Sequence, residues 1–373
     1  MVGGRGRSRG SPAVRREPRR GLARGLGRRD PVTGAPVVAR GLIGSAGDRT
    51  YVASPLHKQR YDLATGECLD DPDLSLRTWA GRVRNGVIEI GLPAATATRC
   101  DRIGPMPFAS VGNIDLYYEV AGSGPPVLFI SGTGGDLRRK PNVFDGPLAR
   151  GATLASYDQR GLGQSTKPDS VPTMADYADD AAGVLAHLGW ESVRVVGVSF
   201  GGMVAQELVL RHPHLVERLV LCCTSSGGAG GSSYPLHELA DLEPDQRRRR
   251  QLAISDTRRD EAWQAAEPDK AATVLELMAA DAEPLDDDPD RERGGRFQLE
   301  ARKGHDTWER LPEITIPVLL TAGRFDGIAP VSNSEAIASR LPDASLQVFE
   351  GGHLFLLQDR SAWPAIVDWL DLD

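Results

Sequence analysis

From Phe108 onward, short apolar runs alternate with longer segments in which apolar residues recur every three or four positions. The short runs predict buried strands and the longer segments predict amphipathic helices. Strands are expected at 114–120, 127–130, 153–157, 193–198, 216–222, 318–321 and 346–349, and helices at 175–188, 203–211, 334–341 and 362–370. Strands and helices that alternate in this way form a mostly parallel sheet with helices on both faces. The fold class predicted for 108–373 is therefore α/β.

One long interval, between the strands expected at 216–222 and 318–321, interrupts this alternation. It is Gly-rich at 227–231 and then helical and highly charged. An insertion placed between two sheet strands would lie as a helical cap over the end of the sheet, and we expect this cap at about 225–310. Its four consecutive arginines, 247–250, are interpreted as a solvated helix face, with attraction of an anionic substrate as the alternative.

The first quarter of the chain shows a different pattern. Strands are expected at 37–43 and 50–53, and 82–90 reads as a hairpin whose Asn85-Gly86 pair is typical of a type I′ turn. These strands predict a small all-β domain over 30–92. Residues 93–107 are expected to be a linker because they carry neither a helix nor a strand pattern. Residues 1–29 have no hydrophobic periodicity and predict a disordered tail.

Charge and composition narrow the range of partners. A length of 373 residues favours two domains. Residues 1–29 contain ten arginines and one glutamate, so they carry a charge of +9. Because the net charge of the whole chain is −7, the remaining residues carry −16. An acidic body argues against nucleic acid as a partner. The basic tail has three alternative interpretations. It is an inert solvated segment, a nucleic-acid-binding arm, or the product of a start codon assigned too early. No apolar run approaches the roughly 20 residues that a membrane-spanning helix needs.

The four cysteines, Cys68, Cys100, Cys222 and Cys223, match neither the spacing of a metal site nor a disulfide framework. Cys222 and Cys223 directly follow an apolar run and are expected in the core. We therefore expect no bound metal and a reducing, cytoplasmic location.

The segment 54–72 resembles Rieske-like domains, especially the small subunit of assimilatory nitrite reductase, and the resemblance covers about 30–92. A cluster-binding Rieske domain uses two cysteines and two histidines. The second Cys–His pair falls on Ser54 and His57, so its cysteine is missing, and Cys68 lies too far along to replace it. No iron–sulfur cluster is expected, His57 is interpreted as a structural loop residue, and a role in protein docking is the function this domain could serve.

The strand expected at 193–198 carries the motif Gly197-Val198-Ser199-Phe200-Gly201 at its end. A strand that turns at once into a helix holds the central serine in a strained conformation with its hydroxyl exposed. The glycines remove side chains that would collide in so tight a turn. A Gly-rich turn with a passive serine is the alternative, but the correct order of strand, motif and helix favours Ser199 as a nucleophile.

A serine nucleophile needs a base, and the best base is a histidine oriented by a carboxylate. His353 closely follows the strand expected at 346–349, and Asp326 follows the strand at 318–321. Both therefore reach the sheet edge at which Ser199 lies. His212 and His214, at the end of the helix after Ser199, are expected to interact with its terminal carbonyls. The order Ser199, Asp326, His353 is that of α/β-hydrolase triads.

These features together resemble the α/β-hydrolase superfamily over about 108–373, closest to small esterases, cofactor-free haloperoxidases and enol-lactonases. The resemblance implies an oxyanion hole formed by the backbone N–H groups of Phe200 and of a residue in the loop 131–135, for which we choose Thr133. It implies a hydrolase that needs no cofactor and acts on a small-molecule ester or lactone. A non-catalytic ligand-binding protein on the same scaffold and an accessory role like that of the nitrite reductase small subunit are the alternatives. The motif around 157–165 is interpreted as structural.

Overall fold

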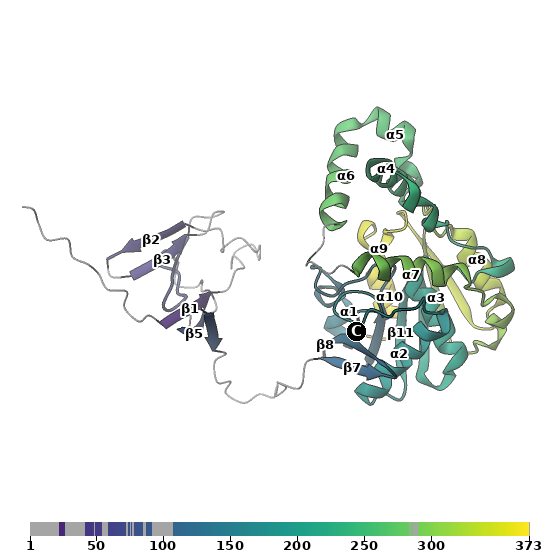
Figure 1. Ribbon diagram of the computed structural model, residues 1–373, viewed down its shortest axis with the longest axis horizontal. Coiled ribbons are helices and arrows are strands. Elements are labelled where there is room, and N and C mark those ends of the chain that lie inside the picture. The colour runs from purple at the N-terminus through teal and green to yellow at the C-terminus, as the bar shows by residue number, and fades with distance from the viewer. Residues whose placement is uncertain are drawn as a thin grey trace, which may run out of the picture. The chain divides into compact units, whose positions relative to one another are not determined.

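The computed structural model describes residues 22–26, 42–47, 49–53, 59–71, 74, 76, 78–84, 87–91, 107–282, 285 and 290–372. The chain divides into two compact units, Met1–Ile103 and Gly104–Asp373 (Figure 1).

The described residues of the N-terminal unit form two three-stranded antiparallel sheets. One has the order β1-β5-β6 and is formed by β1 (Leu22–Leu26), β5 (Thr78–Arg84) and β6 (Val87–Gly91). The other is formed by β2 (Leu42–Ala46), β3 (Arg49–Ala53) and β4 (Arg60–Asp62). Strands β5 and β6 pair from Arg84↔Val87 outward, which confirms the predicted hairpin. Asn85 and Gly86, and most of the strand expected at 37–43, lie outside the described residues.

Strand β1 corrects the expectation of a disordered tail over 1–29. Its five residues pair with β5 from Leu22↔Arg82 to Leu26↔Thr78. A five-residue strand can be held by backbone hydrogen bonds to a neighbouring strand, so it needs no long hydrophobic period of its own. The β domain therefore begins no later than Leu22. Residues 1–21 lie outside the described part of the chain, as do Ser54, His57, Cys100 and the expected linker up to residue 106.

The second unit is built on an eight-stranded sheet with the order β14-β13-β12-β11-β9-β10-β8-β7. Its strands are β7 (Phe108–Val111), β8 (Ile114–Gly122), β9 (Pro126–Ile130), β10 (Thr153–Tyr157), β11 (Val193–Val198), β12 (Val216–Cys222), β13 (Val318–Gly323) and β14 (Ala344–Phe349). The six strands from β14 to β10 are mutually parallel, whereas β8 runs antiparallel to its two neighbours. This is the predicted α/β fold.

The strand order reverses at β9, because β10 lies on one side of it and β11 on the other. The loops that leave β9 and β11 therefore diverge and open a crevice at the carboxyl ends of the strands. Ligands of open α/β sheets bind at such a point. The loop 131–135 and Ser199 both lie there.

Two hydrophobic cores cover the two faces of the sheet. Along β12, Leu219 and Leu221 belong to one core, while Val220 and Cys222 belong to the other. This alternation is the period of two that a strand buried on both faces requires. The first core includes α2 (Met174–Leu188), α3 (Phe200–Arg211) and α8 (Val331–Arg340), and the second includes α1 (Leu148–Gly151), α9 (Phe355–Gln358) and α10 (Ala362–Trp369).

The insertion between β12 and β13 contains most of the remaining helices. They are the 3₁₀ helices η4 (Gly228–Gly230), η5 (Leu236–Asp241), η6 (Thr257–Arg259) and η7 (Trp308–Glu313), and the α-helices α4 (Pro244–Ser255), α5 (Glu261–Ala266), α6 (Pro268–Ala282) and α7 (Arg291–Lys303). Helices α4, α5 and α6 project together from the body, whereas α7 lies across it (Figure 1). We call this insertion the cap. The arginines at 247–250 lie on α4 and are mostly exposed, as expected.

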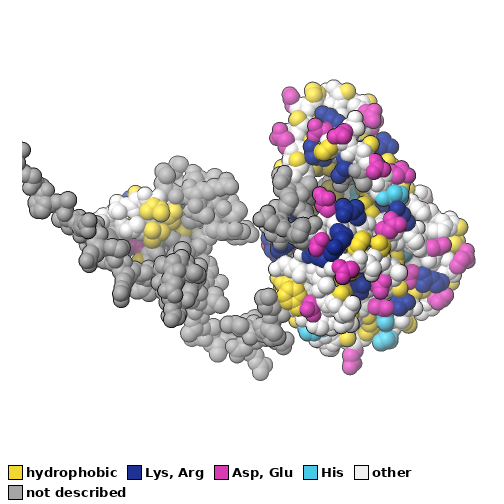
Figure 2. All heavy atoms as spheres, viewed as in Figure 1, with side chains coloured by type: hydrophobic (Ala, Val, Ile, Leu, Met, Phe, Trp, Pro, Cys, Tyr) yellow, Lys and Arg dark blue, Asp and Glu magenta, His cyan; other side chains and the backbone are white. Residues whose placement is uncertain are grey.

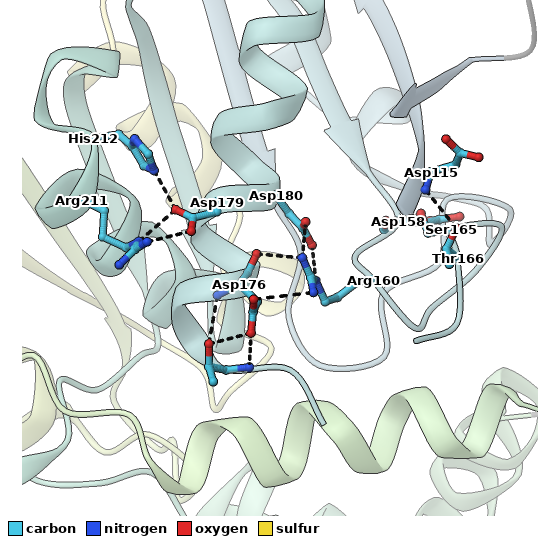
Figure 3. A network of polar contacts seen from close by, with 11 residues as sticks. Asp115, Asp158, Arg160, Ser165, Thr166, Asp176, Asp179, Asp180, Arg211 and His212 are labelled. Carbon is cyan, nitrogen blue, oxygen red and sulfur yellow. Dashed lines mark hydrogen bonds and ion pairs between the residues drawn. The ribbon is translucent and has the colours of Figure 1, made fainter. Parts of the chain in front are cut away.

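The loop after β10 is held by buried polar contacts (Figure 3). The two oxygens of Asp158 accept backbone hydrogen bonds from Leu137 and Gln164 at 2.7 and 2.8 Å. Arg160 donates to both oxygens of Asp180 on α2, each at 2.6 Å. These contacts tie the loop to its neighbours on two sides. They agree with a structural interpretation of the motif at 157–165.

Two histidines at the end of α3 were expected to interact with its terminal carbonyls, and for His212 the structure differs. Its Nε2 lies 2.8 Å from Oδ1 of Asp179 on α2, beside the ion pair of Arg211 with the same carboxylate (Figure 3). A carboxylate is a stronger partner for imidazole than a backbone carbonyl because it carries a full charge. His212 therefore joins two helices instead of capping one.

Acidic and basic side chains are interspersed over the visible face of the second unit (Figure 2). Among the described helices, none combines the length and the apolar character that crossing a membrane requires.

Candidate active site

Ser199 lies between the last residue of β11 and the first residue of α3, with φ +55° and ψ −115°. A positive φ is costly for a residue with a side chain, so the surrounding structure must impose it. Gly201 shows how closely the chain is packed, because a Cβ atom there would lie 2.1 Å from the carbonyl oxygen of Ile130. Only glycine allows α3 to start so near to β9. The strained strand-to-helix turn is the one that the sequence motif predicts.

The structure brings the three predicted triad residues together. Nε2 of His353 lies 3.0 Å from Oγ of Ser199, and Nδ1 of His353 lies 2.7 Å from Oδ2 of Asp326. The Asp326 side chain is fully buried, and its other oxygen accepts the backbone N–H groups of Ile328 and Ala329 at 2.8 and 2.9 Å. A carboxylate fixed in this way favours the tautomer with a proton on Nδ1. That tautomer leaves Nε2 free to accept the serine proton.

The loop that carries His353 is held by the cap. The backbone N–H of His353 donates a 2.6 Å hydrogen bond to the carbonyl of Ser255, at the end of α4. A Cβ atom on Gly352 would lie 2.0 Å from the same carbonyl oxygen. The glycine before the histidine is therefore needed for the close approach of the cap backbone.

The loop after β9 lies beside the nucleophile and is held at two points. The side-chain amide of Gln159 donates to the carbonyl of Ser131 at 2.7 Å, and the backbone N–H of Gly134 donates to Oε1 of Gln298 at 2.8 Å. Thr133 lies between these points and lines the same cavity as Ser199. The second predicted oxyanion donor, Phe200, is the first residue of α3, and its buried ring packs edge-on against Tyr177 at 5.0 Å.

Ser199, His353 and Thr133 line a cavity of about 640 Å³. Its apolar wall has three sources. They are the cap, the sheet-edge loops and the body of the unit, which contribute Leu236, Leu252, Val274 and Met278, then Ile328 and Leu354, and then Phe129, Leu137, Val143 and Val198. Arg139, Arg259 and Gln251 add polar groups. A cavity of this size with a mostly apolar lining and a few polar groups is typical of a site for a small molecule.

Cys223 is buried beside the triad, and its sulfur lies within 4.8 Å of ligand atoms of Asp326 and His353. These three residues are the only candidate metal group in the described part of the chain. Burial, with the charge of Asp326 adding to it, holds the pKa of the Cys223 thiol well above its ordinary value. A metal needs a thiolate, and the histidine and the aspartate already bind each other. The arrangement therefore suits a hydrogen-bonded pair better than a metal centre.

Sequence reasoning missed three residues that support the site, namely Gln298, Ser255 and Thr224. The first two come from the cap, and Oγ1 of Thr224 donates to the carbonyl of Ser199 at 2.8 Å. The cap residues belong to helices without a recognisable motif. Thr224 lies two residues after the end of β12, at the sheet edge that carries Ser199. That position was the only feature of the sequence that could have pointed to its role.

Comparisons with known proteins agree with this fold and site. Residues 125–359 match the family of the alpha/beta hydrolase fold. The chain is 30% identical over 258 residues to the "Putative carbamate hydrolase RutD" of Azorhizobium caulinodans, covering 67% of this chain and 92% of that protein. The protein of the same name from Caulobacter vibrioides is 32% identical over 287 residues, covering 70% and 98%. The crystal structure of the enol-lactonase from Burkholderia xenovorans LB400 superimposes with a TM-score of 0.57 at 23% identity, covering 71% of this chain and 100% of that one.

The chain therefore belongs to the α/β-hydrolase fold family and is a hydrolytic enzyme. In addition, residues 22–91 match the Rieske-like [2Fe-2S] domain, which confirms the predicted resemblance.

The residues of this chain do not fit a Rieske cluster. The matched range 22–91 contains one cysteine, Cys68, and one histidine, His57, whereas the cluster needs two of each. Cys68 packs in a small buried core with Val52, Tyr61 and Leu76, and its backbone N–H donates to the carbonyl of Leu74 at 3.1 Å. Its side chain is thus part of the packing of the domain.

Proposed function

We propose that this enzyme is a serine hydrolase that cleaves a carboxylic ester or lactone through an acyl-enzyme. The observation that carries the proposal is the unbroken line of hydrogen bonds from Ser199 through His353 to the buried Asp326. Fully assembled in this way, the three groups have the geometry of nucleophile, base and orienting acid.

In the first half-reaction, Oγ of Ser199 attacks the carbonyl carbon of the substrate while its proton passes to Nε2 of His353. The resulting imidazolium is stabilised by Asp326. The N–H groups of Thr133 and Phe200 would donate to the oxyanion of the tetrahedral intermediate. When the intermediate collapses, the bond from carbon to the leaving oxygen breaks, and His353 returns its proton to that oxygen. In a lactone the released hydroxyl stays attached to the acyl group.

In the second half-reaction, water takes the place of the leaving alcohol. His353 accepts a proton from the water as its oxygen attacks the acyl carbon, and a second tetrahedral intermediate forms. Its collapse breaks the bond to Ser199, whose Oγ regains the proton from His353. The products are a carboxylic acid and the free enzyme.

Hydrolysis of a carbamate is the second candidate, because the two relatives quoted above, at 30 and 32% identity, carry that name. The same triad can attack a carbamate carbonyl, with an amine nitrogen in place of one carbon substituent. The mostly apolar cavity favours esters or lactones as the first class to test.

A fluorophosphonate probe tests the mechanism, and a substrate panel tests the class. The full chain should be labelled in a single peptide that contains Ser199, as identified by mass spectrometry. Short acyl esters, lactones and aryl carbamates, assayed at matched concentration, then rank the three substrate classes. Absence of labelling together with absence of turnover on the whole panel would favour a ligand-binding protein on this scaffold.

A further inference from the structure

A second cavity, of about 240 Å³, lies at the base of the cap. It is lined by Ser225, Ser233 and His237 on the segment that leads from β12 into the cap, and by Arg302 and His305 on the segment that leads back toward β13. Met203 of α3 contributes the wall on the side of the body. None of the triad residues lines it. The two chain segments that connect the cap to the sheet therefore meet around this cavity.

Arg302 stands out among the residues of this cavity because its charge has no acidic partner within the described part of the chain. Its side chain is half-buried, and its Nη2 donates to the backbone carbonyl of Tyr234 at 3.3 Å. Burial lowers the pKa of Arg302 to about 10. By contrast, Arg310 nearby is paired with both oxygens of Glu207, which raises its pKa. A half-buried cation without a counter-charge is unfavourable, so the surroundings of Arg302 are suited to an anion.

The remaining lining groups have the same preference. Every titratable residue of this cavity is basic: Arg302, Lys303, His237 and His305, apart from the phenol of Tyr234. Three serine hydroxyls are added by Ser225, Ser232 and Ser233, and the first and last of these lie 2.9 Å apart. Lys303 already pairs with Glu300 at 2.6 Å, and burial lowers the pKa of His305 to about 4, so that its ring is neutral near pH 7. The one strong, uncompensated charge is that of Arg302.

We propose that this cavity binds a small oxyanion, a carboxylate or a phosphate, through the guanidinium of Arg302. The planar guanidinium can donate two parallel hydrogen bonds to two oxygens of such a group. Serine hydroxyls can donate to the remaining oxygens. Water occupies about 30 Å³ per molecule, so the cavity admits a ligand the size of a few waters. Because both connections of the cap line the cavity, the bound anion holds them together.

Binding to the folded state alone stabilises that state, so thermal unfolding reports occupancy. The full chain is titrated with inorganic phosphate and, separately, with succinate, at an ionic strength held constant with sodium chloride. The unfolding temperature should rise and then saturate with at least one of the two anions. Isothermal calorimetry should give one site per chain, and the anion with the lower Kd identifies the group that the cavity prefers.

Arg302→Met should remove the saturable shift, while Arg296→Met should keep it. Arg296 lies on the same helix, is exposed, and makes an ion pair with Glu292 at 3.6 Å, so the two variants lose the same charge. Without added anion, Arg302→Met should be at least as stable as the original chain, because it loses an unpaired, half-buried charge. A purely structural arginine would instead lower the unfolding temperature equally with and without the anion, and that result would overturn the proposal.

Arg302→Lys keeps the charge but loses the paired donors, and it serves if Arg302→Met does not fold. It should raise the Kd for the preferred anion by about tenfold, equivalent to roughly 1.4 kcal/mol. An unchanged Kd in this variant would reject Arg302 as the binding group. A shift in the original chain that is linear in concentration for both anions, or no shift with either, would reject the site itself. None of these measurements uses catalysis, so they stand apart from the test of the triad.

Discussion

Oε1 of Gln298 accepts a 2.8 Å hydrogen bond from the backbone N–H of Gly134. Gln298 is fully buried on α7 of the cap, and Gly134 lies directly after Thr133 in the loop beside the nucleophile. The contact therefore joins the cap to the loop that is proposed to hold the developing oxyanion. Within the described residues, Nε2 of the same side chain has no hydrogen-bond partner. The acceptor oxygen is thus the functional half of this amide.

Gln298→Met should lower kcat, because the loop that carries Gly134 loses the acceptor that holds it. A tenfold loss corresponds to about 1.4 kcal/mol, within the range for one lost hydrogen bond. Gln298→Glu replaces the unpartnered nitrogen with a second oxygen and keeps an acceptor at the same place, and burial opposes its ionisation, so it should restore part of the rate. Steady-state kinetics of the three proteins on one ester measures both effects. Equal kcat values for the methionine variant and the original chain would show that the loop does not depend on this contact.

Ser199→Ala should abolish fluorophosphonate labelling and reduce ester turnover by a factor on the order of 10⁴ or more. The hydroxyl makes no capping hydrogen bond to the backbone of α3, and alanine keeps the same Cβ atom at φ +55°, so the fold should persist. Circular dichroism and thermal unfolding provide the control. Undiminished turnover in this variant would show that another group is the nucleophile.

Asp326→Asn should lower kcat by roughly 10⁴, because an amide at this place favours the wrong tautomer of His353. The asparagine oxygen can still accept from Ile328 and Ala329, which keeps the turn in place. Measurement of kcat with a saturating ester, together with thermal unfolding of the variant, separates loss of activation from loss of fold. If the rate is unaltered, Asp326 is not the orienting acid.

Much of this site could be predicted from the chain, for identifiable reasons. Ser199, Asp326 and His353 each follow a strongly apolar strand. Because the carboxyl ends of parallel strands lie at the same edge of a sheet, the three residues could be expected close together. The positions of Gln298 and Ser255 could not be predicted in this way. They lie on cap helices whose place is set by packing against distant loops, and no local pattern encodes that packing. Strand β1 was missed for a related reason, since pairing with β5, over fifty residues away, determines its conformation.

The pH dependence of stability should show the burial of Asp158. Burial raises its pKa from 3.8 to about 6. Between these values the folded chain binds more protons than the unfolded chain, so this contribution to stability is present below pH 3.8 and is lost as the pH rises through 6. The full shift corresponds to about 3 kcal/mol at most. His305, whose pKa burial lowers to about 4, gives the opposite slope between pH 4 and 6.5.

Comparison with Asp158→Asn isolates this effect, because both proteins keep His305. The free energy of unfolding of both proteins is measured with urea at pH 4 and at pH 7. The original chain should gain stability relative to the variant when the pH falls from 7 to 4. Its gain relative to the variant on acidification is the contribution of Asp158. A difference that is constant with pH would mean that this carboxyl group titrates normally.

Removal of the Rieske-like domain should leave most of the hydrolytic activity. A chain that begins at Gly104 keeps the eight-stranded sheet, both of its cores, the cap and all three triad residues. Each strand of the first unit pairs only with other described strands of that unit, so no sheet is cut. The values of kcat and KM of this shortened chain on one ester, compared with those of the full chain, test the expectation. Its Ser199→Ala variant supplies the background rate.

The iron content of the full chain provides the complementary measurement. With one cysteine and one histidine in the matched range, the domain should carry no stoichiometric iron and show no visible absorption of a Rieske type. The two results together would assign the domain an accessory role, such as docking of a protein partner, without redox chemistry. Loss of all activity on truncation, in a protein that still unfolds cooperatively, would instead mean that this domain completes the active site. Stoichiometric iron would require ligands from outside the matched range.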